Sequence, residues 1–163
     1  MRLVLENVWG DVAFDGGASL KVPRLNSVGG VFAVVKVSES NITLPLKRIG
    51  QGLTIKSCSN LATLSLNDLT TIGGRTTIDA TYSLTSLNLK SLTTLEGDFE
   101  LNAHHLQKLI LNSQLTNSHI TMISADTDCL RMYDVYAGAL PSLMCVPTEY
   151  TSRSTSELTI VDA

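Results

Sequence analysis

One side-chain pattern returns about every 23 residues through the middle of the chain. The clearest offsets of 23 join aliphatic residues: Leu64 to Leu87, Leu66 to Leu89, and Ile72 to Leu95. Between them, short runs alternate apolar and polar residues, which is the pattern of half-buried strands, and no window has a helical spacing. Gly-Gly and Gly-Asp pairs separate the runs, where a positive φ costs little. A repeat of this length predicts a solenoid whose coils stabilise one another.

The repeat predicts an all-β fold, a right-handed parallel β-helix of about five coils with three short strand faces per coil. Leucine and isoleucine ladders would fill its interior, with coils about 4.8 Å apart. Burial of one leucine side chain stabilises by roughly 1.5–3 kcal/mol, so several coils together hold a domain. We expect the solenoid at residues 1–126, with the clearest repeats at 46–123. Residues 127–163 would form a C-terminal cap and polar tail, in which 158–161 could add a closing strand.

Composition agrees with a single domain and argues against binding to nucleic acid and against a membrane span. The 163 residues are 44% apolar and 17% charged, unlike a disordered polar chain. The net charge is −3 with no Lys/Arg cluster, so the basic surface of a nucleic-acid-binding protein is absent. No run approaches the roughly 20 apolar residues of a membrane span. The N-terminus meets Glu6 after a short apolar run and does not have the pattern of a signal peptide.

Three cysteines leave the redox compartment open. Their odd number slightly favours a reducing compartment, and a disulfide between Cys129 and Cys145 with a free Cys58 is the alternative. Asn41 begins an Asn-Ile-Thr tripeptide, which is a candidate N-glycosylation site. Both a reducing and an oxidising compartment therefore stay open.

Two stretches of the repeat resemble a known family: Ile-Gly-Gln-Gly-Leu-Thr-Ile-Lys-Ser-Cys-Ser-Asn-Leu at 49–61 and Leu-Thr-Thr-Ile-Gly-Gly at 69–74. They are similar to the receptor L-domain, a leucine-rich repeat of insulin and epidermal growth factor receptor ectodomains and of fungal and microbial surface proteins. Residues 10–123 carry the resemblance, without the cysteine-rich modules of the receptors. Residues 57–64 also resemble leucine-rich repeats of bacterial and protozoan surface proteins. Both resemblances imply an extracellular or cell-surface recognition protein; an intracellular location stays open.

Residues between the inward positions are expected to face solvent and to stack in rows across coils. Two such rows form the candidate ligand-binding face: Lys56, Asp79 and Asn102, and beside them Thr54, Thr77 and Glu100. A solvated face explains the rows without any ligand and is the simpler interpretation, because Lys56 opposite Asp79 is a ladder pair worth about 0.2–1 kcal/mol.

Catalytic and metal sites are weaker hypotheses. A polysaccharide-cleaving β-helix enzyme would use carboxylates such as Asp79, Asp98 and Glu100, but it needs two acids at a fixed separation and long loops that the sequence lacks. His104 and His105 are adjacent on an expected turn, whereas a metal site needs three or four converging ligands. We expect no catalytic residues, no metal and no cofactor.

Outward threonines raise one further hypothesis, binding to ice or to a crystalline polysaccharide. Such a lattice needs the same outward threonine in consecutive coils. Thr71 and Thr94 satisfy this requirement, but Arg48 and Ser27 interrupt the row, and threonine is a common strand residue in any case.

These observations together predict a non-catalytic recognition or adhesion module that binds a protein or a glycan through a solenoid face. The alternative is a structural subunit or fragment of a larger surface assembly. In that case the chain would associate end to end through its N-terminal edge, where the sequence shows no cap and where unpaired strands offer hydrogen bonds to another chain.

Overall fold

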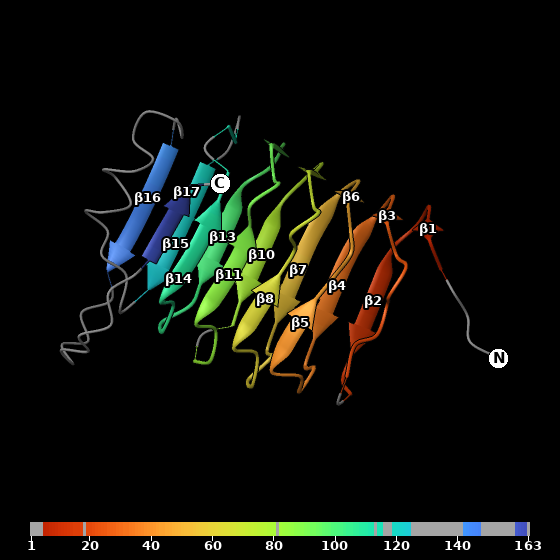
Figure 1. The fold of residues 1–163 in the computed structure, drawn as a ribbon, viewed down its shortest axis with the longest axis horizontal. Helices are drawn as coiled ribbons and strands as arrows, with labels where there is room; N and C mark the ends of the chain where they lie inside the picture. The colour runs from red at the N-terminus through yellow and green to blue at the C-terminus, as the bar shows by residue number, and fades with distance from the viewer. Residues whose placement is uncertain are drawn as a thin grey trace.

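The computed structural model describes residues 5–17, 19–80, 82–112, 114–115, 119–124, 142–147 and 159–162 (Figure 1). In this part of the chain every regular element is a β-strand. No helix of the described residues has the length and apolar character that a membrane crossing requires. The predicted all-β solenoid of parallel strands is confirmed.

Three parallel sheets form the faces of the solenoid. Sheet A contains the two-residue strands β1 (Asn7–Val8), β3 (Ser27–Val28), β6 (Arg48–Ile49), β9 (Thr71–Ile72) and β12 (Thr94–Leu95). Sheet B contains β2 (Val12–Asp15), β4 (Val31–Val35), β7 (Gly52–Lys56), β10 (Thr76–Asp79), β13 (Phe99–Asn102), β15 (His119–Ser124) and β16 (Ser142–Pro147). Sheet C contains β5 (Asn41–Thr43), β8 (Thr63–Ser65), β11 (Ser86–Leu89), β14 (Lys108–Leu111) and β17 (Thr159–Asp162). The coils follow one another along the long axis of the molecule (Figure 1).

The register of sheet B reproduces the repeat. Leu53 pairs with Thr76 and Thr76 with Phe99, an offset of 23 residues in each case. Toward the N-terminus the coils shorten, because Val12 pairs with Phe32 and Phe32 with Leu53, offsets of 20 and 21. The drift of the sequence pattern upstream therefore reflects shorter corners, while the strands stay aligned.

Inward side chains stack into continuous aliphatic ladders. In sheet C, Leu64 pairs with Ile42 on one side and Leu87 on the other, and all three are at most 2% exposed. Thr76 is the exception in sheet B: its side chain is fully buried at a position that is leucine or phenylalanine in the neighbouring strands. Its Oγ1 has no hydrogen-bond partner among the residues that the structure describes.

The corners impose their own residue requirements. Between sheets A and B, Gly50 and Gly73 stack so closely that a Cβ on either one would overlap the carbonyl oxygen of the glycine one coil before, Gly29 or Gly50. Between sheets B and C, Lys36 and Ser57 have φ angles of 54° and 55°. This left-handed region disfavours residues with a side chain.

Two strands lie beyond residue 126, where the sequence predicts a cap and tail. β16 extends sheet B by pairing with β15, and β17 returns to pair with β14 in sheet C. β17 corresponds to the closing strand predicted at residues 158–161. The rest of that segment, including Cys129 of the predicted Cys129–Cys145 disulfide, lies outside the described residues.

Candidate ligand-binding face

The outward face of sheet B carries all six predicted residues in two rows. The parallel register of β7, β10 and β13 places them in the predicted order: Lys56–Asp79–Asn102 and Thr54–Thr77–Glu100. Alternation within β10 explains this arrangement, because Thr76 and Ile78 are buried while Thr77 and Asp79 are partly exposed. The position of the rows, although not their binding role, therefore follows from strand alternation and equal coil length.

A third row lies immediately before the inward residues of three successive strands. Arg75 precedes β10, Asp98 precedes β13, and His119 begins β15. The register places these three residues on neighbouring coils in that order. A carboxylate thus lies between two basic side chains at strand spacings of about 4.8 Å. Sequence reasoning did not single out Arg75 or His119 as part of this face, although the offset of 23 from Arg75 to Asp98 was an available signal.

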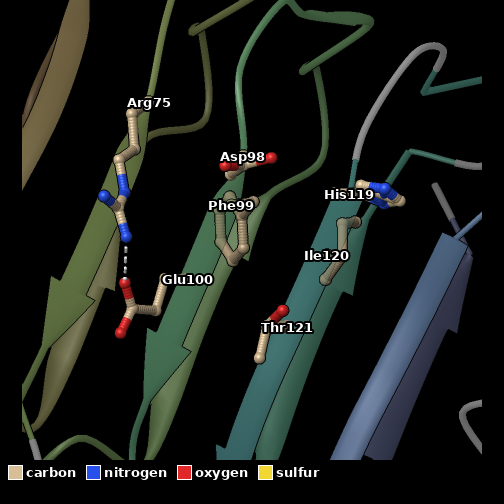
Figure 2. Close-up of a pocket in the computed structure, with 7 residues that line it drawn as sticks. All are labelled: Arg75, Asp98, Phe99, Glu100, His119, Ile120 and Thr121. Atoms are coloured by element: carbon tan, nitrogen blue, oxygen red, sulfur yellow. Dashed lines mark hydrogen bonds and ion pairs between the residues drawn. The ribbon is translucent and has the colours of Figure 1, made fainter.

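Two hollows open on this face and share Arg75 and Glu100. The first, of about 330 Å³, is lined by five of the six predicted residues, all except Thr54, together with Arg75 and Ile78. The second, of about 470 Å³, is lined by Arg75, Asp98, Glu100, His119 and Thr121 beside Phe99 and Ile120. Figure 2 shows these side chains on the successive strands that form the second hollow. The two hollows together follow sheet B from β7 to β15.

The two hollows meet at an ion pair. Arg75 Nη2 donates to Glu100 Oε2 at 2.9 Å across one coil (Figure 2), and the two side chains are 68% and 40% exposed. Solvent screening limits such a pair to about 0.2–1 kcal/mol, so either partner can turn to a ligand at small cost. Lys56 and Asp79, the expected ladder pair, are opposite in register, but among the described residues the ion pair that forms is Arg75–Glu100.

Asn102 adds an amide to the floor of the first hollow. Its Oδ1 is buried and has no hydrogen-bond donor within the described structure. A buried acceptor without a donor costs free energy, and a ligand in the hollow could pair with this oxygen only if the side chain turned outward.

Other candidate residues lie away from this face. His104 and His105 occupy a turn, as predicted, and His104 lies against Tyr82 with ring centroids 5.7 Å apart. Across the described residues, no group of three His, Cys, Asp or Glu side chains gathers as a metal site would require. Asn41 of the glycosylation tripeptide is exposed on β5, the last strand of sheet C on the N-terminal side.

Cys58 is buried in the core and is 1% exposed. Its Sγ lies 3.4 Å from the carbonyl oxygen of Lys56. Burial raises the pKa of the thiol, and backbone hydrogen bonds at Val37 and Lys36 offset part of this effect. A desolvated thiol is a poor nucleophile at neutral pH, which fits a packing role.

Three threonine hydroxyls of the described residues donate to the backbone of the preceding coil, and one of them is Thr85 Oγ1, which donates to the carbonyl oxygen of Ala62 at 3.1 Å. Thr70 Oγ1 donates to the carbonyl oxygen of Lys47 at 2.9 Å, and Thr93 Oγ1 donates to that of Thr70 at 3.2 Å. These bonds connect successive coils. The threonine row considered for lattice binding is in register along sheet A, where Arg48 and Ser27 interrupt it as predicted: Ser27, Arg48, Thr71 and Thr94. A two-threonine row is too short for a lattice-binding surface.

Comparisons with known proteins add no relative. No protein-family model matches the chain, and no curated protein and no solved structure is significantly similar to it. The comparisons therefore assign no family, and the receptor L-domain resemblance rests on the repeat residues alone. The face on sheet B has to be interpreted from its own chemistry.

Proposed function

We propose that this protein is a non-catalytic recognition or adhesion module that binds a protein or a glycan through the outward face of sheet B. The observation that carries the proposal is the pair of hollows joined at Arg75 and Glu100, lined by five of the six outward residues. Because the repeat resembles the receptor L-domain of surface proteins, we propose that the module lies at the cell surface.

The chemistry of the face suits a polar ligand held across several coils. Lys56 and Arg75 supply cations, Asp79, Asp98 and Glu100 supply carboxylates, and Asn102 supplies an amide. Hydroxyl groups of a glycan, or the backbone and charged side chains of an extended peptide, find donors and acceptors in such an array. The rigid stacking of the strands holds these groups in place before binding, which lowers the entropy cost of association.

A direct test screens the purified protein against a glycan array and a phage-displayed peptide library, and then measures the dissociation constant of each hit. Arg75→Glu reverses the one positive charge among the residues that line both hollows. We expect this variant to weaken binding at least about tenfold, equivalent to about 1.4 kcal/mol. Lys108→Glu is the matched control, because it makes the same charge change at an exposed residue of β14 in sheet C.

The control variant should keep its affinity within about twofold, since a surface charge outside the contact acts only through screened electrostatics. Equal weakening by both substitutions would show that binding follows overall charge and would contradict the proposed face. The absence of any glycan or peptide hit would contradict the recognition function itself.

The structural-subunit alternative has one observation of its own in favour. The N-terminal end of the solenoid leaves apolar side chains partly exposed. A surface of that kind fits association with another chain, and it lies apart from the face on sheet B.

A further inference from the structure

The first coil forms an apolar end surface on the solenoid. Among the residues whose burial the structure describes, the partly buried hydrophobic side chains that pack against the core belong to this coil and come from its three sides: Val8 on β1, Val12 and Phe14 on β2, and Val22 on the third side. One coil later, the equivalents of Val8, Val12 and Phe14 are at most 1% exposed. Leu5 and Trp9 add side chains that are 49% and 94% exposed.

This end also presents an unpaired strand edge. β2 is the last strand of sheet B on this side and pairs with β4 alone among the described strands. Gly16 N donates to Val35 O at 2.8 Å, so Phe14, two residues away, also directs its backbone toward β4. Backbone groups alternate in direction along a strand. Ala13 and Asp15 therefore direct their N–H and C=O groups to the open edge, where they can pair with another strand.

We infer that the occupant of this end is a second copy of the same chain, related by a two-fold axis through the middle of sheet B. This symmetry places β2 antiparallel to β2 of the second copy, so that the B sheets of the two copies form one continuous sheet. With Phe14 opposite its own equivalent, Ala13 faces Asp15 of the other copy as a hydrogen-bonded pair, and the reverse pair forms as well. The alternative register centred on Ala13 places Asp11 opposite Asp15, where like charges repel.

The charges at the end surface are complementary under this symmetry. A two-fold axis through sheet B sets the sheet A side of one copy against the sheet C side of the other, about one strand spacing away. Glu6 lies exposed at the start of the sheet A side, and Arg24 lies exposed at the end of the sheet C side. The two residues are stacked near one corner, because the backbone carbonyl of Glu6 accepts hydrogen bonds from Asn26 and Ser27. Glu6 of each copy thus meets Arg24 of the other.

The two ends of the described solenoid differ in how many strands each sheet contributes. At the opposite end sheet B continues two strands beyond β13, sheet C continues one strand beyond β14, and sheet A ends at β12 in the described residues. The N-terminal end, in contrast, has β1, β2 and the Leu20–Pro23 segment on its three sides, so two copies of it meet evenly. The described residues therefore support head-to-head pairing through the first coil.

Sedimentation equilibrium from about 1 to 500 µM tests this dimer, with an expected species of twice the 17.5 kDa chain mass. Ala13→Pro removes an edge N–H that β4 does not use, and proline is tolerated on such an edge. Because the two-fold symmetry removes the Ala13 N–H hydrogen bond once in each copy, we expect the dissociation constant of the dimer to rise about thirtyfold or more. Circular dichroism verifies that the variant remains folded.

Charge exchange supplies an independent arm that does not depend on proline. Glu6→Arg and Arg24→Glu should each weaken the dimer, and the double variant should recover the parent dissociation constant to within about threefold. A chain that is monomeric at 500 µM with slowly exchanging amides at Ala13 and Asp15 would show that its own residues cover the edge, and would overturn the inference. A dimer indifferent to Ala13→Pro and to both charge reversals would place the interface elsewhere and overturn it equally.

Discussion

Replacing Thr76 with valine exchanges a fully buried hydroxyl for a methyl group of similar size. The Thr76 side chain has no exposed surface, and no described residue forms a hydrogen bond with its Oγ1. On either side its inward neighbours in sheet B are Leu53 and Phe99. The substitution therefore removes an unsatisfied polar group and adds a contact to an apolar ladder.

The magnitude follows from the cost of burying an unpaired hydroxyl, about 1–3 kcal/mol. Valine is β-branched like threonine, so strand propensity changes little. We expect Thr76→Val to raise the free energy of unfolding by about 1–2 kcal/mol. For a domain of this size, that gain corresponds to an increase in Tm of about 3–6 °C.

Urea unfolding followed by far-UV circular dichroism measures the change, as a higher midpoint with an unaltered m-value. Thr77→Val is the matched control: the next residue along the strand is partly exposed, and we expect an effect within about 0.5 kcal/mol. A loss of stability for Thr76→Val would mean that the hydroxyl is satisfied in solution, and would refute the reasoning.

The same assay tests four further substitutions. Lys36→Gly should stabilise by about 1 kcal/mol, because it relieves a φ of 54°; a loss would mean that the side chain contributes more than the strain. Gly73→Ala should destabilise by about 2–3 kcal/mol, since its Cβ would overlap the carbonyl of Gly50. Leu87→Ala should cost about 2–5 kcal/mol at a fully buried ladder position. Because burial raises the pKa of the Cys58 thiol, the unfolded thiol ionises first, and stability should fall above about pH 9; Cys58→Ala should lack that loss.

Much of the architecture could be predicted from sequence because two periods reinforce each other. Alternation along a strand determines which side chains face outward, and the 23-residue offset determines which residues are adjacent across coils. Together the two periods predict that Lys56, Asp79 and Asn102 share one row, and the register agrees. The closing strand at 159–162 was visible as an apolar run, but its pairing with β14 was not, because a pairing across intervening chain leaves no local signal.

The ion pair at the site was harder to predict. Arg75 precedes its strand, so strand alternation says nothing about its direction. It reaches Glu100 on the next coil because of the corner geometry and a long side chain, which no pattern of spacing records. Likewise, Lys36 and Ser57 adopt a left-handed backbone where the sequence offers no glycine, because neighbouring coils hold the corner in that shape.

The distance between spin labels at Ala13 and Thr121 tests the stacked-row architecture most directly. The register links these outward positions through Ala33, Thr54, Thr77 and Glu100, which makes five strand spacings. At about 4.8 Å per spacing the backbone separation is about 24 Å. Double electron–electron resonance on a background without the three native cysteines should give one narrow distribution near that value, at protein concentrations where the chain is monomeric. A broad distribution, or a narrow one centred beyond about 35 Å, would contradict the solenoid and with it the face on sheet B.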